Sequence, residues 1–176
     1  MKKTVFVLIA ALLLGAAAFA QESNFSSPRP QFLAFDLGAG FGYSLSDASG
    51  YAIGTGQLGG VVNFGFKIAV LDNFGVGFDS LIAGSGSAVA PLFAGIRLAY
   101  NIIPQAGAAI GFGVTGFGGS PSAPALSLGI YGDLFQRRSV LTGITTGFRL
   151  RLDYIAPAGD IARGAFVFAP AFSFGL

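Results

Sequence analysis

The strongest constraint on this chain is a strict alternation of apolar and small residues between positions 33 and 45. The apolar or aromatic members are Leu33, Phe35, Leu37, Ala39, Phe41, Tyr43 and Leu45, and between them lie Ala34, Asp36, Gly38, Gly40, Gly42 and Ser44. A period of two predicts a β-strand with two unlike faces. In a soluble sheet the apolar face would form a core, whereas in a membrane barrel it faces lipid and the small face lines the lumen.

The same alternation recurs along the chain and predicts eight strands. We expect them at residues 33–45, 57–70, 74–82, 89–102, 106–117, 125–134, 140–154 and 165–176. From the second strand onward the apolar set is even-numbered. In the fourth strand, for example, it comprises Leu92, Ala94, Ile96, Leu98, Tyr100 and Ile102.

Charged residues test this register independently, because they were not used to set it. All eight charges within the predicted strands fall on the face opposite the apolar set: Asp36, Lys67, Asp79, Arg97, Asp133, Arg149, Arg151 and Asp153. Fifteen of the eighteen glycines in these strands share that face. The apolar face is thus free of charge on every strand, as a lipid-facing surface requires.

Composition decides between the two kinds of sheet. Only 10% of the residues are charged and 53% are hydrophobic, whereas a soluble domain carries about 25% charged residues. A soluble β-sandwich would expose a glycine-rich surface with only these eight charges. We therefore predict an all-β fold, a transmembrane antiparallel up-and-down β-barrel of eight strands over residues 32–176.

The first twenty residues have the pattern of a cleavable signal peptide. Lys2 and Lys3 precede an apolar run, and Ala18-Phe19-Ala20 fits the cleavage rule; an uncleaved anchor is the alternative. Cleavage would leave residues 21–31 as a periplasmic N-terminal segment. We expect the secreted barrel to reside in the outer membrane of a diderm, Gram-negative-type bacterium. Without Lys2 and Lys3 the chain has eight basic and eight acidic residues, so we expect no binding to nucleic acid.

The predicted connections alternate in length. Residues 71–73, 103–105 and 135–139 are expected to be tight turns, and residues 46–56, 83–88, 118–124 and 155–164 longer loops. Short periplasmic turns and long extracellular loops are typical of outer-membrane barrels.

The inward charges are expected to close the lumen as an ion-pair network. Counting along the strands places Asp36, Lys67, Arg97 and Asp133 in the periplasmic half and Asp79, Arg149, Arg151 and Asp153 in the extracellular half. Each layer is neutral, and Asp36 with Lys67 is the favoured single pair. Phe93, Phe117 and Tyr131 are the larger uncharged lumen residues. They either fill the barrel or line a path for a small hydrophobic solute.

Residues for common catalytic chemistry are missing. With no histidine or cysteine, serine–histidine and cysteine–histidine catalysis and thiolate metal sites are unavailable, so we expect no enzyme activity, no cofactor and no metal. Residues 111–116 read Gly-Phe-Gly-Val-Thr-Gly, but a dinucleotide site needs a helix after this motif, and none is predicted.

Aromatic residues mark the expected membrane boundaries. Tyr43, Tyr100 and Tyr154 point outward near strand ends, as interfacial aromatics do. The last stretch, FVFAPAFSFGL, resembles the C-terminal signal strand recognised by the barrel-assembly machinery, with Phe172, Phe174 and the final Leu176 at its alternating positions. Pro170 within it predicts a bulge or a distorted ladder.

With its signal peptide and eight alternating strands, the mature chain resembles the small outer-membrane barrels that include OmpW, OmpX and the OmpA membrane domain. The resemblance implies outer-membrane lipid and the barrel-assembly machinery as partners. OmpX-like proteins are linked to surface interaction, and OmpW-like proteins to the passage of small hydrophobic molecules. We therefore expect a barrel with a narrow or closed, charge-paired lumen and a structural or surface role. A porin-like conduit for small hydrophobic solutes is the alternative, and a barrel-embedded hydrolase or acyltransferase is disfavoured.

Overall fold

The computed structural model describes residues 32–44, 58–85, 88–117, 120–139, 141–160 and 163–176. The predicted signal peptide, the 21–31 segment and the 46–56 loop lie outside them. The described residues form nine strands: β1 (Leu33–Ser44), β2 (Leu58–Leu71), β3 (Phe74–Ser85), β4 (Ala88–Ile103), β5 (Ala106–Phe117), β6 (Ser120–Arg138), β7 (Thr145–Pro157), β8 (Ala165–Phe168) and β9 (Ala171–Gly175). Within these ranges no helix has the length and apolar character to cross a membrane.

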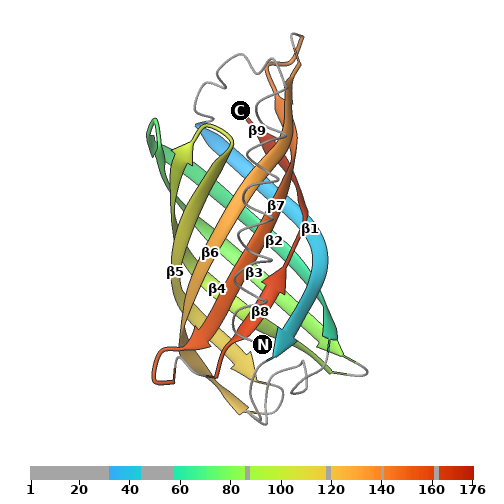
Figure 1. The fold of residues 1–176 in the computed structure, drawn as a ribbon, viewed down its shortest axis with the longest axis vertical. Helices are drawn as coiled ribbons and strands as arrows, with labels where there is room; N and C mark the ends of the chain where they lie inside the picture. The colour runs from blue at the N-terminus through green and yellow to red at the C-terminus, as the bar shows by residue number, and fades with distance from the viewer. Residues whose placement is uncertain (1–31, 45–57, 86–87, 118–119, 140, 161–162) are drawn as a thin grey trace, which may run out of the picture.

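The strands close into a single antiparallel ring (Figure 1). Each strand from β1 to β7 pairs with the next in the chain, and β8 and β9 both lie between β7 and β1. Consecutive strands are therefore neighbours all the way round. The predicted all-β antiparallel barrel is confirmed.

The predicted strand over residues 165–176 is two strands, so the described part of the barrel has nine rather than eight. Pro170 has no N–H to donate to a ladder, and the strand is interrupted at Ala169 and Pro170, although Ala169 N still donates to Arg151 O at 3.0 Å. The register nevertheless continues across the break. Phe168 and Ala171 lie opposite Phe41 and Gly38 of β1, and opposite Leu152 and Arg149 of β7. Because each partner strand also advances by three residues, no bulge forms there.

The barrel has two rims, and we call the one where β1 begins and β9 ends the terminal rim. There, β6 and β7 form a hairpin that projects beyond the neighbouring turns (Figure 1). The predicted turn at 135–139 was wrong, because β6 continues to Arg138 and β7 begins only at Thr145. The reversal instead uses Gly143, whose φ of +70° lies in the left-handed region that favours glycine.

At the opposite rim the predicted long loops are shorter than expected. Only residues 86–87 separate β3 from β4, and only residues 118–119 separate β5 from β6. The Gly, Ser, Ala and Pro residues nearby predicted loops by composition, but the ladders of the two hairpins extend through them. Pairing with a neighbouring strand here outweighs local strand propensity.

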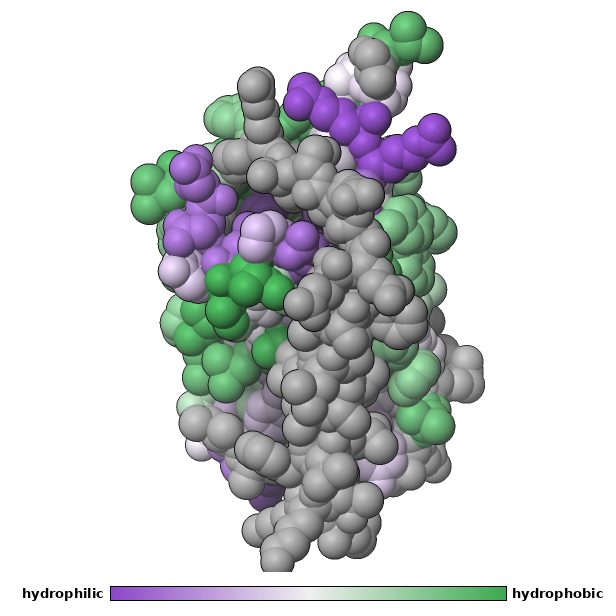
Figure 2. Space-filling model, turned by 45° about the horizontal axis from the view of Figure 1, so that its top comes forward, coloured by the Kyte–Doolittle hydropathy of each residue, from purple (hydrophilic) through white to green (hydrophobic). Residues whose placement is uncertain are grey.

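Apolar side chains cover the outside of the barrel. Figure 2 shows hydrophobic residues along the side of the molecule and hydrophilic residues gathered at the terminal rim. Leu37, Phe64, Ile96 and Phe112 are each about half exposed, as expected of the outward set. Leu92 is the exception, since it is buried at a register shift where Leu81 faces Phe93 and Ile82 faces Pro91. This bulge turns Leu92 away from the outer surface.

An apolar cluster fills the lumen toward the opposite rim. Its members are Val61, Leu81, Ala83, Leu92, Phe93, Ala125, Ile155, Ala165, Val167 and Ala169. Nine of them come from six strands and Ala169 lies between β8 and β9. None is more than 3% exposed. This half of the barrel is therefore packed like a protein core, and charged side chains occupy the half nearer the terminal rim.

Candidate functional site

Four charged side chains form a closed ring of ion pairs across the lumen. Arg97 of β4 donates from Nη1 to Asp79 Oδ2 at 2.8 Å and from Nη2 to Asp153 Oδ1 at 2.7 Å. Arg151 of β7 donates to the same two carboxylates, reaching Asp79 Oδ1 at 2.9 Å. Each arginine thus bridges both aspartates. We call this set the charge ring.

The charge ring is neutral and almost completely buried. The side chains of Asp79 and Asp153 are 4% and 0% exposed, and those of Arg97 and Arg151 are 11% and 6% exposed. Desolvating isolated charges costs several kcal/mol each, so only mutual pairing makes this arrangement stable. The ring ties β3, β4 and β7 together through the middle of the barrel.

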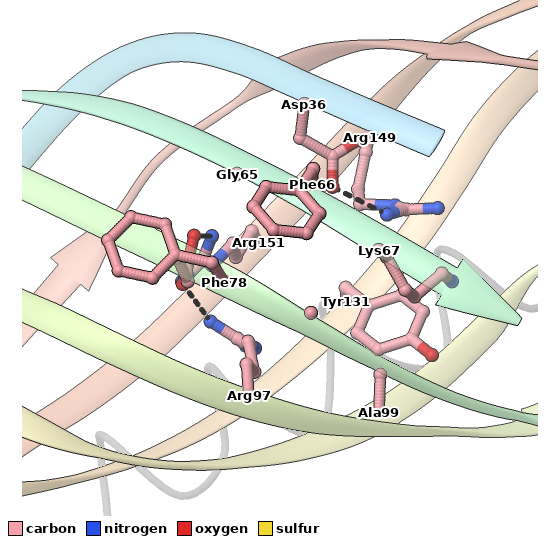
Figure 3. Close-up of a pocket in the computed structure, with 12 residues that line it drawn as sticks. Asp36, Gly65, Phe66, Lys67, Phe78, Arg97, Ala99, Tyr131, Arg149 and Arg151 are labelled. Atoms are coloured by element: carbon pink, nitrogen blue, oxygen red, sulfur yellow. Dashed lines mark hydrogen bonds and ion pairs between the residues drawn. The ribbon is translucent and has the colours of Figure 1, made fainter. Parts of the chain in front are cut away.

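A second cluster lies nearer the terminal rim and centres on Arg149. Its guanidinium donates from Nη1 to Asp36 Oδ2 at 2.9 Å, and from Nε and Nη2 to the two oxygens of Asp133 at 2.6 and 3.1 Å. Gln136 Nε2 also donates to Asp133 Oδ2, at 2.6 Å. We call these residues the Arg149 cluster; its pair with Asp36 is drawn in Figure 3.

The structure divides the eight predicted lumen charges differently from the two expected layers. Arg97 lies in the charge ring instead of beside Asp36 and Asp133, and Arg149 takes its place there. Strands in a barrel are tilted against its axis, so equal positions along two strands are not equal heights in the lumen. The two layers were expected from positions along the strands alone, without this tilt.

Lys67 does not form the expected ion pair with Asp36. In the described part of the chain, no carboxylate lies within ion-pair distance of its ammonium group. Lys67 Nζ lies instead 5.8 Å from the ring centroid of Tyr131, and Arg149 Cζ lies 4.9 Å from the same centroid. Tyr131 donates its hydroxyl to Asn101 Oδ1 at 2.5 Å. One aromatic ring therefore contacts two cations (Figure 3).

A cavity of about 410 Å³ opens beside these residues at the terminal rim. Lys67, Asn101, Gln136 and Arg149 line its inner part, and residues of the β2–β3 and β4–β5 turns line its outer part. We call it the mouth. A much smaller cavity of about 40 Å³ lies between Tyr131 and the charge ring. The described lumen thus narrows sharply inward from the mouth.

Inward glycines make room for the large side chains of neighbouring strands. A Cβ built on Gly129 would lie 2.0 Å from Asp153 Oδ1 and 2.3 Å from Arg97 Nη2. One on Gly111 would lie 2.8 Å from Phe93 Cζ. Sequence reasoning noted that glycines face inward but did not identify Gly129 as a site residue. No local sequence signal distinguished it, because its position directly opposite Asp153 depends on the register between β6 and β7.

Gln136 is a second functional residue that sequence reasoning missed. It was expected in a turn, yet it lies on β6 and contacts Asp133. A register shift between Asp133 and Phe135 places Leu134 in a bulge and reverses which residues face inward beyond it. The even–odd pattern gave no warning of this reversal.

The other predicted positions fall at varied places in the barrel. Phe93 is fully buried in the apolar cluster, and the side chain of Phe117 lies outside the described residues. Tyr43 and Tyr100 are exposed, whereas Tyr154 packs against Phe166 with ring centroids 5.0 Å apart. The assembly-signal positions are all exposed: Phe172, Phe174 and Leu176.

The remaining sequence motifs provide no recognisable catalytic or cofactor geometry. Residues 111–116 run within β5, and residues 111–114 are paired on both sides. They therefore do not form the strand-to-helix turn of a dinucleotide site. Among the described residues, no group of three or more acidic, histidine or cysteine side chains is placed to hold a metal ion.

No protein-family model matches the chain, and no curated protein matches it. A solved structure described as "De novo design of transmembrane beta-barrels" is similar to it, with a TM-score of 0.47 and 13% sequence identity. The alignment covers 84% of this chain and 98% of that chain.

Proposed function

We propose that this protein is an integral outer-membrane β-barrel whose lumen is closed, and that it has a structural or surface role rather than a transport role. The single observation that carries the proposal is the charge ring. It crosses the lumen between β3, β4 and β7 and lies directly against the apolar cluster.

The outer surface supports the membrane location. Large apolar side chains are exposed on all sides of the barrel, whereas soluble proteins rarely expose large contiguous apolar patches. Every charge on the predicted strands faces inward or lies in the lumen clusters, which is the arrangement that a lipid environment favours. Such a barrel would meet outer-membrane lipid with its wall, and Tyr43 and Tyr100 suit the two interfaces.

The route to the membrane is part of the same proposal. We propose that the signal peptide is removed after Ala20 and that the barrel-assembly machinery recognises the C-terminal strand. The outward-facing Phe172, Phe174 and Leu176 support this assignment, because their side chains remain accessible on the outer surface. On this proposal the protein resembles OmpX in role more than OmpW.

A closed lumen is supported by how tightly it is filled. Asp79, Arg151 and Asp153 are each at most 6% exposed, and Phe93 is fully buried. A conduit for hydrophobic solutes would need Phe93 to line an open path, and no described observation favours that alternative. Nothing in the charge ring suggests catalysis either, since each of its carboxylates is held by two arginines.

Conductance in a planar bilayer tests the closed lumen. The refolded wild-type protein should carry no steady current. Asp79→Ala combined with Phe93→Ala should conduct, because the two changes break the charge ring and open the apolar cluster behind it. Asp160→Ala is the matched control, since Asp160 forms an exposed pair with Arg163 outside the lumen, and it should stay silent. A steady wild-type current would overturn the closed barrel and favour a pore.

A further inference from the structure

Strand β6 has a free edge at the terminal rim, on the hairpin that projects beyond the neighbouring turns (Figure 1). Its ladder with β5 ends where Asp133 N donates to Gln105 O at 2.7 Å, yet β6 continues to Arg138. Within the described residues, no strand pairs with residues 134–138 on the side away from β7. The other side of the hairpin is covered, because β9 pairs with β7. We call residues 134–138 the β6 edge.

The β6 edge has main-chain groups available for a further strand. Ser139 N donates to Ile144 O at 2.9 Å, so the odd-numbered residues just before Ser139 bond toward β7. In an antiparallel ladder the residues between them direct their N–H and C=O groups to the opposite side. Gln136 and Arg138 therefore direct these groups away from the barrel's own sheet. A row of such groups is a template for pairing with another chain.

Charge identifies the kind of chain that fits the β6 edge. Arg137 and Arg138 are exposed, and no described carboxylate lies within ion-pair distance of either. Asp133, the acidic residue closest to them along β6, is engaged by Arg149 and Gln136. The described barrel thus leaves two positive charges beside an open ladder.

We propose that the β6 edge binds an extended acidic segment of a partner protein, which joins the sheet as an antiparallel strand. Main-chain hydrogen bonds hold the segment in place, and its carboxylates pair with Arg137 and Arg138. The five residues of the edge span about 17 Å, close to the usual length of a strand. The inference goes beyond the proposed function and does not depend on a closed lumen.

A second copy of this chain fits the β6 edge less well than an acidic partner does. Antiparallel pairing of two such edges would bring two arginines from each copy onto one short ladder, and residues 134–138 contain no carboxylate to offset them. Like charges at facing positions repel each other. The bulge at Leu134 and the two arginines therefore oppose self-association and leave the edge open to a chain of opposite charge.

Binding of a probe peptide to the refolded protein in detergent tests the inference. The probe is a fluorescent seven-residue peptide of alternating glutamate and threonine, and fluorescence anisotropy measures its affinity. The same peptide methylated at every backbone nitrogen keeps its charge but cannot donate hydrogen bonds to the edge. It should bind about ten-fold more weakly. Equal affinity of the two peptides, or no binding of the unmodified one, would overturn strand addition.

The combined change Arg137→Gln and Arg138→Gln tests the charge requirement. It should weaken binding of the unmodified peptide about ten-fold, because two exposed ion pairs are lost. Arg163→Glu is the matched control, since it lowers the net charge by the same two units and Arg163 is exposed at the opposite rim. Equal weakening by both changes would mean that the peptide responds only to net charge and would overturn the site.

The dependence on protein concentration distinguishes the acidic peptide from a second copy. The measured affinity of the peptide should be the same at every protein concentration. An affinity that falls as the protein concentration rises would show that a second copy competes for the β6 edge and would overturn the proposal. Conductance is a separate matter: a current through the wild type would overturn the closed lumen and leave peptide binding unaffected.

Discussion

Arg97 and Asp153 are 56 residues apart in the chain, yet Nη2 and Oδ1 meet at 2.7 Å in the lumen. Their contact passes directly over Gly129 of β6, where a Cβ would lie within 2.3 Å of both atoms. The absence of a side chain at Gly129 is therefore a requirement of the charge ring.

Gly129→Ala should destabilise the barrel. The new methyl group would displace either Asp153 or Arg97, and overpacking of this kind costs about 1–3 kcal/mol. Denaturant unfolding of the protein in detergent or lipid measures the loss. Gly60→Ala is the matched control, because the nearest atom to its Cβ would be 4.0 Å away. Equal stability of the two variants would show that the ring tolerates a side chain beneath it.

Asp153→Asn should be much more damaging than Asp160→Asn. Asp153 is fully buried between two arginines, and removing one partner of a buried ion pair costs about 3–5 kcal/mol. Asp160 pairs with Arg163 at the surface, with side chains 45% and 61% exposed, and such a pair contributes about 0–1 kcal/mol. The same unfolding assay compares them, and a loss of similar size in both would argue against the buried ring as a stabilising element.

Tyr131→Phe should have a small effect and Tyr131→Ala a large one. The phenylalanine variant loses only the hydrogen bond to Asn101, worth about 0.5–1.5 kcal/mol, and keeps an aromatic ring against Lys67 and Arg149. The alanine variant also loses the ring, and truncating a large buried aromatic costs about 3–5 kcal/mol. If both variants were equally stable, the two cation contacts would contribute nothing measurable.

Gly38→Ala should hinder closure of the barrel. A Cβ there would lie 2.1 Å from Pro170 O and 2.7 Å from Ala171 Cα, so main-chain atoms of the closing strand would have to move. Refolding yield, read from the different gel migration of folded and unfolded barrels, should fall sharply. Gly159→Ala is the control, because nothing lies within 4 Å of its Cβ; an equal yield in both would mean that the β1–β9 seam can separate without penalty.

The facing of side chains could be predicted from the sequence because it depends on a local period of two. Odd-numbered residues of β1 and even-numbered residues of the remaining strands were expected to face outward. Phe35, Phe64 and Ile96 follow this rule and are exposed on the outer surface. The rule fails at Leu92 and beyond Leu134. A bulge near each of these positions exchanges the inward-facing and outward-facing residues, and a bulge leaves no trace in composition.

The partners of the lumen charges could not be predicted in the same way. Which arginine reaches which aspartate depends on the tilt of the strands and on how far each neighbour is shifted, and neither quantity is a local property. Arg97 and Arg149 therefore exchanged places relative to the expected layers. A bulge or a distorted ladder at Pro170 was expected, since proline lacks an N–H, but the division into β8 and β9 was not. The unbroken register across Pro170 depends on pairing with both β1 and β7.

The charge ring draws on β3, β4 and β7, so it cannot be completed until most of the chain is in place. If any of these strands slipped by a single residue, its arginine or aspartate would turn to the outer face of the barrel. In the proposed membrane location, each arginine so exposed would cost about 2–4 kcal/mol at the bilayer midplane, and the partners left inside would be buried without a counter-charge. A wrongly registered barrel would therefore be destabilised twice, whereas the correct register closes the barrel without uncompensated charge in the ring.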